Sequence, residues 1–449
     1  MPDARAAHLA RREALAASLQ AQSGAAPLGL AKGTSNLFRD RNEDAKQRLD
    51  LHHFSNVIEV DARQGWVDVE GLCTYEDLVA GTLPHGVMPA VVPQLKTITI
   101  GGAAAGVGIE ATSFRQGLVH DTLLEIDVLL PHGEIVTCTP DNERRDLFFG
   151  FPNSYGTLGY ALRLRARVLP VKRFVRVEHT RARGAERFFE LLAERCAGAA
   201  DFVDGVVFNA DEYVLNTGVF VDEAPWQSDY TFEQIYYKSL LEKEVDYLTA
   251  HDYIWRWDTD WFWCSKNLYA QNPVVRKLLG RERLNSRTYT RVMRFNSKWG
   301  FTRRLSRLRG RHPESVIQDV DIPLARAHEF LDFFLREVGV LPIWICPIGP
   351  AQHGPAFSLY PLTSQGLYVN FGFWDVVESK TAHEPGYFNK LIERKVLDLG
   401  GIKSLYSDCY FDRETFARAY ALDRYEALKA KYDPQRRTLD LYEKCVLRA

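Results

Sequence analysis

The alternation of hydrophobic and polar residues predicts short helices and strands at the start of the chain. Residues 5–22 carry apolar positions at helical spacing and predict an amphipathic helix. The stretch IEVDARQGWVDVEG alternates with a period of two, which predicts a hairpin of strands at 57–60 and 66–70. Gln64-Gly65 lies where that hairpin must turn, so we expect a β-sheet to begin here.

Capping and turn residues predict the next elements. Thr74 can cap a helix, because Asp77 occupies the third helical position and can bond back to the cap. Residues 123–130 and 134–139 predict a second hairpin. The run GTLGYALRLRARVLPV alternates Leu and Arg, which is typical of a strand with one face in water. We expect the first domain to comprise residues 1–170.

The rest of the chain differs in composition and predicts a second lobe. Residues 171–320 are rich in Tyr, Trp and Arg, and the run YIWRWDTDWFWC contains four of the nine tryptophans. A chain of 449 residues is too long for one ordinary core. The sequence therefore predicts an α+β protein with a cap domain at 171–420 and a C-terminal segment at 421–449 that returns to the first domain. Elements of the cap are predicted at 319–340 (strand, then helix), 341–348 and 368–373 (strands) and 385–399 (helix).

Composition and charge exclude several classes of protein. The chain is 46% hydrophobic and 25% charged with a formal net charge of −2, which is typical of a soluble protein and argues against general binding of nucleic acid. One short basic run can be a solvated face or a contact for an anionic headgroup or nucleotide. Its residues are Arg303, Arg304, Arg307, Arg309 and Arg311.

The N-terminus and the cysteines indicate a cytoplasmic protein. The first 22 residues scatter charges among Ala and Leu and lack the apolar core of a secretory signal. No window of about 20 apolar residues predicts a membrane span. The seven cysteines are far apart and form no CxxC pair, which indicates reduced thiols rather than disulfides or a zinc site. We expect a cytoplasmic location and no metal site, and peripheral membrane contact stays open.

The most unusual stretch follows the residues TITI. Gly101, Gly102, Gly106 and Gly108, with three alanines between them, leave almost no side-chain bulk. Such a segment lets the backbone lie against a flat or charged ligand and present N–H groups to phosphate oxygens. The segment also contains G-x-G-x-x-A, the dinucleotide fingerprint, but that motif needs a helix after its turn. The sequence here predicts a strand at TITI and no helix after the glycines.

Two further segments are candidates for contact with the same ligand. Lys32-Gly33-Thr34-Ser35-Asn36 offers backbone and hydroxyl hydrogen bonds in a tight loop that suits a diphosphate. Gly156-Thr157-Leu158-Gly159 lies between a helical turn and a strand. Each segment alone also fits an ordinary surface turn, so the interpretation depends on the order of all three along the chain.

In that order the segments resemble the vanillyl-alcohol-oxidase superfamily of FAD proteins, with its PCMH-type FAD-binding domain. The resemblance rests on KGTSN, PQLKTITIGGAAAGVG and NSYGTLGYALRLRARVLP. It implies that the first segment wraps the pyrophosphate, that the second lines the diphosphate and the isoalloxazine ring, and that the third closes over the adenine. The implied FAD-binding residues are Lys32, Gly33, Thr34, Ser35, Asn36, Ile98, Gly101, Gly102, Ala103, Gly106, Ile109, Ser113, Gly156 and Gly159.

Other motifs resemble one branch of that superfamily. PIWICPI, LYSDCYFDRETF and the position of VIQDVDIPL before them resemble the delta-24 sterol reductases (diminuto/seladin). CTYEDLV, GIEATSFRQGL and FPNSYGTLGY resemble bacterial reductases of methylene-branched fatty acyl chains. The resemblance implies an FAD-dependent reductase of a carbon–carbon double bond in such an acyl chain or in a sterol-like side chain. NADPH is one candidate for the electron donor, which stays undetermined.

The mode of FAD attachment follows from the residues beside it. Many members of the superfamily bond FAD covalently through His or Cys. Residues 31–41 contain no His, and the glycine-rich loop contains neither His nor Cys. We therefore expect FAD to bind non-covalently.

Three functions stay open: reduction of a lipid alkene, oxidation of an alcohol or lactone, and FAD binding without catalysis. An oxidase of polar alcohols needs charged and hydroxyl groups around its substrate, whereas the second lobe is dense in Trp, Phe, Tyr and Ile. That composition favours an apolar substrate, although aromatic residues also build ordinary cores. The candidate lining of an elongated apolar pocket is Trp255, Trp257, Trp261, Phe262, Trp344 and Tyr368.

The LYSDCYF motif offers the acid that an alkene reduction requires. An isolated double bond needs a hydride on one carbon and a proton from an acid held over the other. A strand would place Asp408 and Tyr410 on one face and Cys409 on the other. We predict Tyr410 as the proton donor with Asp408 as its orienting partner, and Glu110 as the second candidate. The alternative interpretation of this motif is an ordinary half-buried strand.

Overall fold

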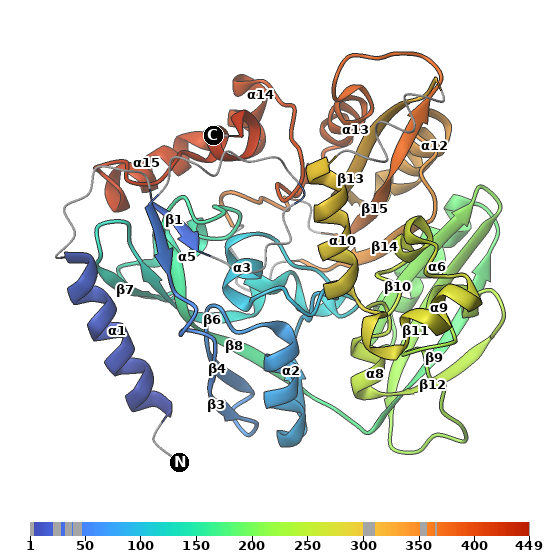
Figure 1. The fold of residues 1–449 in the computed structure, drawn as a ribbon, viewed down its shortest axis with the longest axis horizontal. Coiled ribbons are helices and arrows are strands. Elements are labelled where there is room, and N and C mark those ends of the chain that lie inside the picture. Colours follow the sequence, from blue (N-terminus) through green and yellow to red (C-terminus); the bar gives the residue numbers. More distant parts are fainter. Residues whose placement is uncertain are drawn as a thin grey trace.

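The computed structural model describes residues 4–20, 28–31, 38, 47–299, 310–350, 357–363 and 366–448. Two large antiparallel sheets form separate halves of the molecule, and helices cover both (Figure 1). The prediction of an α+β fold is confirmed. The aromatic-rich loops and the C-terminal part of the chain lie around the junction between the halves.

The first sheet has six strands and contains both predicted hairpins. Its order is β3 (Val57–Asp61), β4 (Trp66–Glu70), β8 (Tyr160–Pro170), β6 (Leu123–Leu129) and β7 (Ile135–Cys138), with β5 (Val87–Pro89) paired to β8. Gly65 turns the first hairpin with a φ of 75°. The predicted cap is also present, because the Thr74 hydroxyl accepts a hydrogen bond from Asp77 N at 3.2 Å at the start of α2 (Tyr75–Thr82).

Short elements surround the first sheet. The N-terminal helix α1 (Ala4–Gln20) matches its prediction and packs on one face of the sheet through Leu19, which joins a small core with Leu129 and Leu162. The remaining elements of this half are β1 (Leu28–Ala31) and β2 (Gln47–Asp50), which pair in parallel, α3 (Ile100–Ala105), α4 (Ser113–Gln116) and α5 (Arg145–Gly150).

The second sheet has eight strands, and its two faces pack differently. Helices cover one face, where Val316 and Val320 meet Phe330 and Phe334. The other face turns toward the aromatic loops and carries Trp344. The strand order is β12 (Val245–Thr249), β9 (Phe174–Ala182), β11 (Glu212–Val221), β10 (Phe202–Asn209), β14 (Ile343–Ile348), β15 (Tyr368–Ser379), β13 (His312–Pro323) and β16 (Ile402–Lys403).

Helices of the second half fall into two groups. α6 (Ala185–Ala197), α12 (Ala327–Glu337) and α13 (Tyr387–Asp398) cover the helical face of the sheet. α7 (Tyr236–Ser239), α8 (Ala250–Ile254), α9 (Pro273–Leu279) and α10 (Ser286–Trp299) come between β11 and β13 along the chain. The predicted elements at 319–340, 341–348, 368–373 and 385–399 are all present with shifted limits.

The C-terminal helices lie over the first sheet (Figure 1). They are α14 (Arg413–Ala419) and α15 (Leu422–Tyr432). Lys429 Nζ donates to Thr157 O at 2.8 Å, and Lys431 pairs with Asp146 at 2.6 Å. The chain therefore returns to the first half, while the domain limits at 170 and 420 stay a prediction.

The prediction of a strand at TITI was wrong, because these residues lead into α3. Thr99 is the N-cap of this helix, and its hydroxyl accepts a hydrogen bond from Gly102 N at 3.2 Å. An alternation of only four residues is too short to decide between a strand and a helix start. Threonine is a good cap, and the alanines after it favour helix.

Candidate functional site

The glycine-rich segment presents a row of small side chains on its accessible side. Gly102 is exposed and Ala105, Val107 and Ile109 are half-buried, whereas the residues between them are buried. A flat ligand can lie against this row without meeting a bulky side chain. FAD therefore fits the segment as a contact surface.

The amides at the start of α3 are bonded within the protein. Ile100 N donates to Cys73 O at 3.0 Å, and Gly101 N donates to Gly71 O at 2.9 Å. Gly102 N is held by the Thr99 hydroxyl. These three N–H groups are not free for phosphate oxygens, so this part of the segment offers shape rather than donors.

Several predicted FAD glycines are also required by packing. A Cβ at Gly101 would lie 2.6 Å from Gly71 O, and one at Gly159 would lie 2.5 Å from Leu129 O. Gly156 has a φ of 76° and Gly159 a φ of 136°, which favour glycine. The presence of glycine at these positions therefore does not distinguish contact with a ligand from close packing within the protein.

The second and third predicted FAD segments lie together. Tyr155 N donates to Ala105 O at 2.8 Å, and Asn153 N donates to Gly106 O at 3.2 Å. Asn153 and Tyr155 have φ values of 62° and 51°, which non-glycine residues rarely adopt and which are often found at functional sites. The structure thus joins two segments that lie about fifty residues apart in the sequence.

The remaining FAD candidates have varied surroundings. Lys32, Gly33, Thr34, Ser35 and Asn36 lie outside the described residues. Ile98 is half-buried and Ala103 is buried beside the first sheet. Ser113 is buried, and its hydroxyl accepts a hydrogen bond from Glu110 N at 3.1 Å.

All six predicted pocket residues are buried. Phe262 stacks on Trp257 with ring centres 4.8 Å apart and meets the edge of Trp344 at 5.5 Å. Trp261 lies 5.9 Å from Phe38, ring centre to ring centre. The aromatic residues thus form one packed group, and an elongated pocket among them stays a prediction.

The other two aromatic candidates lie at the margins. Lys96 Nζ sits 5.5 Å from the ring centre of Trp255, and the Tyr368 hydroxyl accepts a hydrogen bond from Thr363 N at 3.1 Å. The centre of the group carries backbone strain, because Trp261 and Phe262 have φ values of 42° and 58°. Consecutive strained residues need strong support from their surroundings and are common at binding sites.

Glu110 lies in a buried ion pair. Its Oε1 accepts a hydrogen bond from Arg256 Nη2 at 2.8 Å, and the same nitrogen bonds Asp204 at 2.7 Å. Burial raises the pKa of Glu110, and the charge of Arg256 opposes that shift. The pair connects the glycine-rich segment to β10.

Tyr410 and Asp408 lie together, but not on a strand. The prediction of a strand was wrong, because the chain from 404 to 411 forms only an isolated bridge between Ser407 and Phe38. Arg448 Nη2 lies 3.3 Å from the Asp408 carboxylate and donates to the Tyr410 hydroxyl at 3.4 Å. The tyrosine ring packs against Gly386. Their roles in catalysis stay a prediction.

Sequence reasoning missed a group of acids on β13. Asp319 Oδ2 accepts a hydrogen bond from the Tyr406 hydroxyl at 2.6 Å, and Trp374 Nε1 donates to that hydroxyl at 2.9 Å. Asp321 accepts hydrogen bonds at 2.7 Å from both Tyr360 and Asn370. The signal in the sequence was VIQDVDIPL, since two acids on one face of a hydrophobic strand are unusual.

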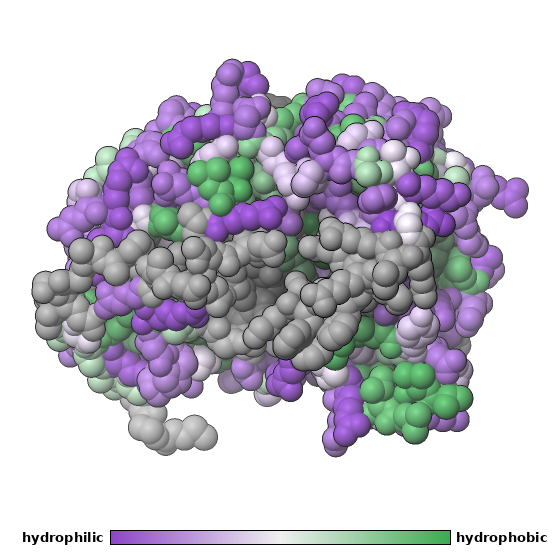
Figure 2. Space-filling model, turned by 45° about the horizontal axis from the view of Figure 1, so that its top comes forward, coloured by the Kyte–Doolittle hydropathy of each residue, from purple (hydrophilic) through white to green (hydrophobic). Residues whose placement is uncertain are grey.

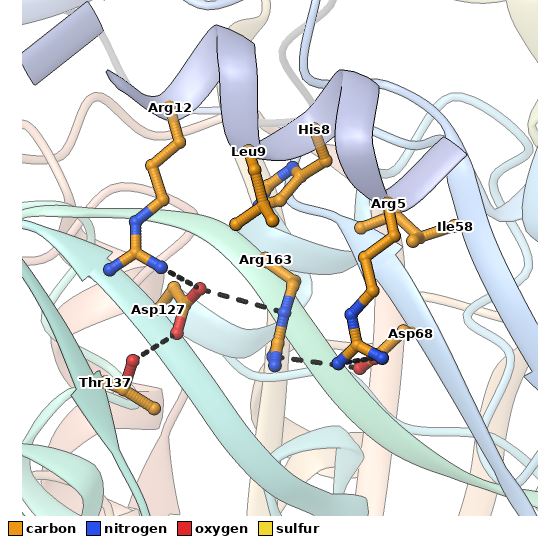
Figure 3. A pocket seen from close by; sticks show the side chains of 9 residues that line it. All are labelled: Arg5, His8, Leu9, Arg12, Ile58, Asp68, Asp127, Thr137 and Arg163. Atoms are coloured by element: carbon orange, nitrogen blue, oxygen red, sulfur yellow. Dashed lines mark hydrogen bonds and ion pairs between the residues drawn. The ribbon is translucent and has the colours of Figure 1, made fainter. Parts of the chain in front are cut away.

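A separate cavity of about 150 Å³ lies between α1 and the first sheet (Figure 3). Its charges compensate one another, because Arg12 lies 3.5 Å from Asp127 and Arg163 lies 3.7 Å from both Asp68 and Asp127. None of the predicted FAD or substrate residues lines it. The cavity is therefore part of the polar contact that holds α1. Its lining is Arg5, His8, Leu9, Arg12, Ile58, Asp68, Asp127, Thr137 and Arg163.

Comparison with a family model identifies the class of protein. The model of an FAD binding domain matches residues 10–139, which include the glycine-rich segment and much of the first sheet. The chain therefore contains a PCMH-type FAD-binding domain, as the sequence predicted. It is an FAD-dependent oxidoreductase.

Curated relatives narrow the class. The chain is 29% identical over 406 residues to Delta(24)-sterol reductase of Homo sapiens, covering 87% of this chain and 76% of the relative. Identity to Delta(24)-sterol reductase of Arabidopsis thaliana is 25% over 443 residues, with the same coverage. A shorter match, 28% over 215 residues and 43% of this chain, is to cytokinin dehydrogenase 10 of Oryza sativa subsp. japonica. The chain is thus related to the Delta(24)-sterol reductases over most of its length, and this prediction is confirmed.

Proposed function

We propose that this protein reduces a carbon–carbon double bond in a lipid, either in a methylene-branched fatty acyl chain or in a sterol-like side chain. The observation that carries the proposal is the relation to Delta(24)-sterol reductases across 87% of the chain, which includes both halves. The packed aromatic group beside the glycine-rich half supports an apolar substrate. Each methylene group buried there contributes about 0.8 kcal/mol to binding.

The chemistry divides between the cofactor and the chain. FAD, when bound non-covalently and reduced, supplies a hydride from its N5 atom. The row of small residues from Gly102 to Ile109 gives the flat ring a surface to lie on. Trp257, Trp261 and Phe262 exclude water, and their faces stabilise positive charge on a substrate carbon. An acid of the chain gives the proton to the other carbon, for which the sequence nominated Tyr410 with Asp408, and Glu110 second.

A dehydrogenase or oxidase acting on an alcohol, lactone or other polar substrate is the second candidate. The match to cytokinin dehydrogenase 10 favours this second candidate, because the match covers 43% of this chain. The aromatic group disfavours it, since a polar substrate needs hydrogen-bonding partners. The two candidates differ in the direction of electron flow.

Anaerobic reoxidation of the reduced flavin tests the proposal directly. We expect methylene-branched or sterol-like alkenes to reoxidise the reduced flavin and to be converted to the saturated product. NADPH is the first reductant to test for reducing the flavin. Saturated analogues of the same lipids are the matched control and should leave the flavin reduced. Fast reoxidation by oxygen together with no reaction with any alkene would favour an oxidase.

We also propose that the second half contacts a membrane surface, where such a substrate is found. Tyr269, Val274 and Leu278, on and just before α9, are 79%, 67% and 76% exposed. Figure 2 shows apolar side chains gathered at the lower right of a largely hydrophilic face, on the side of the second sheet. Arg276 of the same helix holds the aromatic loop through two hydrogen bonds to Asp260, at 2.6 Å and 2.9 Å. No helix of the described ranges has both the length and the apolar character of a membrane span.

Sedimentation with phospholipid vesicles tests this contact. Replacing Val274 and Leu278 with Glu should strongly reduce binding, because the charged groups resist burial among acyl chains. Leu9→Glu is the matched control, since Leu9 is also exposed, at 45%, but lies on α1 in the other half. Equal binding by all three proteins would contradict the assignment of this surface.

A further inference from the structure

Asp319 lies at the point where the predicted FAD segments and the aromatic group meet. On β13, Val316 and Val320 face the helical core, so Asp319 and Asp321 point to the opposite face, toward the aromatic loops. The partner of Asp319, Tyr406, accepts a backbone hydrogen bond at its carbonyl from Phe38 N at 2.9 Å. In the sequence, Phe38 lies two residues after Asn36, the last residue of the first predicted FAD segment.

The other FAD segments reach the same place through Tyr155. Its ring lies 3.4 Å from the position that a Cβ on Gly106 would take. Its hydroxyl lies 3.5 Å from the hydroxyl of Ser404, and Ser404 N donates to Asp319 O at 3.0 Å. Asp319 is therefore linked to the second and third predicted FAD segments through Ser404 and Tyr155.

The aromatic group adjoins the same acid. Trp374 donates to the Tyr406 hydroxyl, and its ring centre lies 4.6 Å from that of Phe262. Asp319, Tyr406 and Trp374 each keep accessible surface, whereas Asp321 is only 1% exposed. Of the two acids, Asp319 is thus the one with surface that a ligand can contact.

We propose that Asp319 donates the proton in the alkene reduction and that Tyr406 positions it. This inference rests on the proposed function of the protein. The sequence nominated Tyr410 as the donor with Asp408 as its orienting partner, and Glu110 second. Asp319 differs from the two carboxyl groups among these residues in its bonding partners. Glu110 is bonded to Arg256 and Asp408 lies beside Arg448, whereas Asp319 is bonded to the neutral Tyr406 hydroxyl.

Burial and the charge of Asp321 favour the protonated form of Asp319. Burial raises the pKa of Asp319 to about 7, the charge of Asp321 adds to the shift, and hydrogen bonds from Tyr406, Trp374 and Asn370 oppose it. No Lys or Arg among the described residues forms a salt bridge with Asp319. Lys403 on the adjacent β16 pairs with Glu393 instead, at 2.7 Å.

The step balances in atoms and charge. The Asp319 O–H bond breaks as its proton forms a C–H bond at one alkene carbon, and the electrons of that new bond come from the alkene π bond. The other carbon becomes positive and takes a hydride from reduced FAD. A two-electron donor of the nicotinamide class must then return the oxidised FAD to its reduced form. Asp319 is left as a carboxylate, which the Tyr406 hydroxyl stabilises until water returns the proton.

Asp319→Asn is the first test, because the amide keeps the shape and removes the acid. The variant should bind FAD and accept electrons as the wild type does, yet reoxidation of its flavin by alkene should fall by about 10²- to 10⁴-fold, the range typical of a general acid. Wild-type reoxidation should slow as the pH rises through about 7, since ionised Asp319 has no proton to give. Tyr406→Phe should shift that pH profile while keeping some turnover.

A spectroscopic measurement tests the protonation without turnover. The infrared difference spectrum of wild type minus Asp319→Asn should contain the band of a protonated carboxyl group at pH 6, and this band should decline above pH 7. Tyr230→Phe is the matched control, because Tyr230 donates to Asp246 at the opposite edge of the same sheet. It should leave both the band and the activity unchanged.

The outcomes separate the two proposals. If Asp319→Asn turned over the alkene at the wild-type rate, Asp319 would be overturned as the acid. The same would follow if Tyr410→Phe lost turnover and Asp319→Asn did not. Either result would leave the reductase function standing. Failure of every alkene to reoxidise the wild-type flavin would overturn the reductase function, and with it the role of Asp319. A wild-type infrared spectrum without the Asp319 band at pH 6 would also exclude Asp319 as the donor.

Discussion

At the scale of single residues, the charges around a buried group decide what it can do. Arg256 is buried between Glu110 and Asp204 and gives both carboxylates a partner. Asp319 is surrounded by neutral donors and one further acid. The first arrangement holds two parts of the chain together, whereas the second has a raised pKa, as the proposed proton transfer requires.

Replacing Arg256 with Leu should therefore destabilise the protein strongly. Glu110 and Asp204 would remain buried without a cation, and removing one partner of such a group costs about 3 to 5 kcal/mol of unfolding free energy. The loss should be smaller at pH 5 than at pH 8, because a Glu110 whose pKa is already raised by burial takes up a proton in acid. Urea unfolding at both pH values measures this, with Arg187→Leu on the surface as the control. Equal losses at the two pH values would contradict the argument.

The exposed Gly102 gives a prediction about the cofactor. Gly102→Val places a branched side chain on the surface where FAD is expected to lie, so flavin occupancy should be lost, and Gly102→Ala should lose less. The flavin absorbance of the purified proteins measures occupancy. Gly198→Val is the control, because a Cβ there meets nothing closer than 3.4 Å. Full occupancy in Gly102→Val would remove FAD from this surface.

At the scale of elements, buried polar contacts fasten helices and loops to the sheets. Glu70 at the end of β4 holds α1 through His8 at 2.8 Å and Arg11 at 2.6 Å, and it also accepts a hydrogen bond from Asn56. Burial raises the pKa of Glu70, but these hydrogen bonds outweigh it and lower the pKa to about 2. The ionised carboxylate is thus the form that the folded protein stabilises.

The attachment of α1 should weaken in acid. Because the folded pKa of Glu70 lies below the ordinary value of 4.5, its contribution is complete above about pH 4.5 and is lost as the pH falls toward 2. The shift corresponds to a contribution on the order of 3 kcal/mol. The protection factors for hydrogen exchange of residues 4–20, which compare each amide with its intrinsic rate, should therefore fall over this range in the wild type. Glu70→Gln should have low protection factors at pH 7 already, and equal wild-type protection factors at pH 7 and pH 2 would contradict this.

At the scale of the whole molecule, the junction of the two sheets brings distant segments to one place. The first half supplies the glycine-rich row and Tyr155, and the second half supplies the aromatic group and the acids of β13. A cofactor held at this junction contacts both halves. Its binding free energy then adds to the stability of the whole protein.

Addition of FAD to the protein freed of flavin should accordingly raise the unfolding midpoint. At a hundredfold excess over the dissociation constant the gain is about 2.7 kcal/mol. Acid precipitation should release the yellow flavin into the supernatant, because residues 31–41 contain no His and the glycine-rich segment contains neither His nor Cys. Scanning calorimetry with and without FAD measures the first effect. Colour that stays with the precipitate would mean covalent attachment.

Patterns that are local in the sequence predicted much of the fold. The two hairpins of the first sheet, the Thr74 cap and the strands predicted within 319–340, at 341–348 and at 368–373 follow from spacing over a few residues, and each is present. The order of the glycine-rich and polar segments identified an FAD-binding domain, which the family model supports. The short stretches TITI and LYSDCYF were predicted wrongly, because a few residues of alternation fit more than one backbone conformation.

What the sequence determined by itself was thus the class of fold, the cofactor and the apolar character of the second half. Only the tertiary structure decided which charges and hydrogen-bond donors surround each acid. The hydrogen bond between Tyr406 and Asp319 spans 87 residues of sequence, and the pair of Arg256 with Glu110 spans 146. A pKa depends on burial and on the charges that surround a group in space, and those neighbours come from parts of the chain that no local pattern connects.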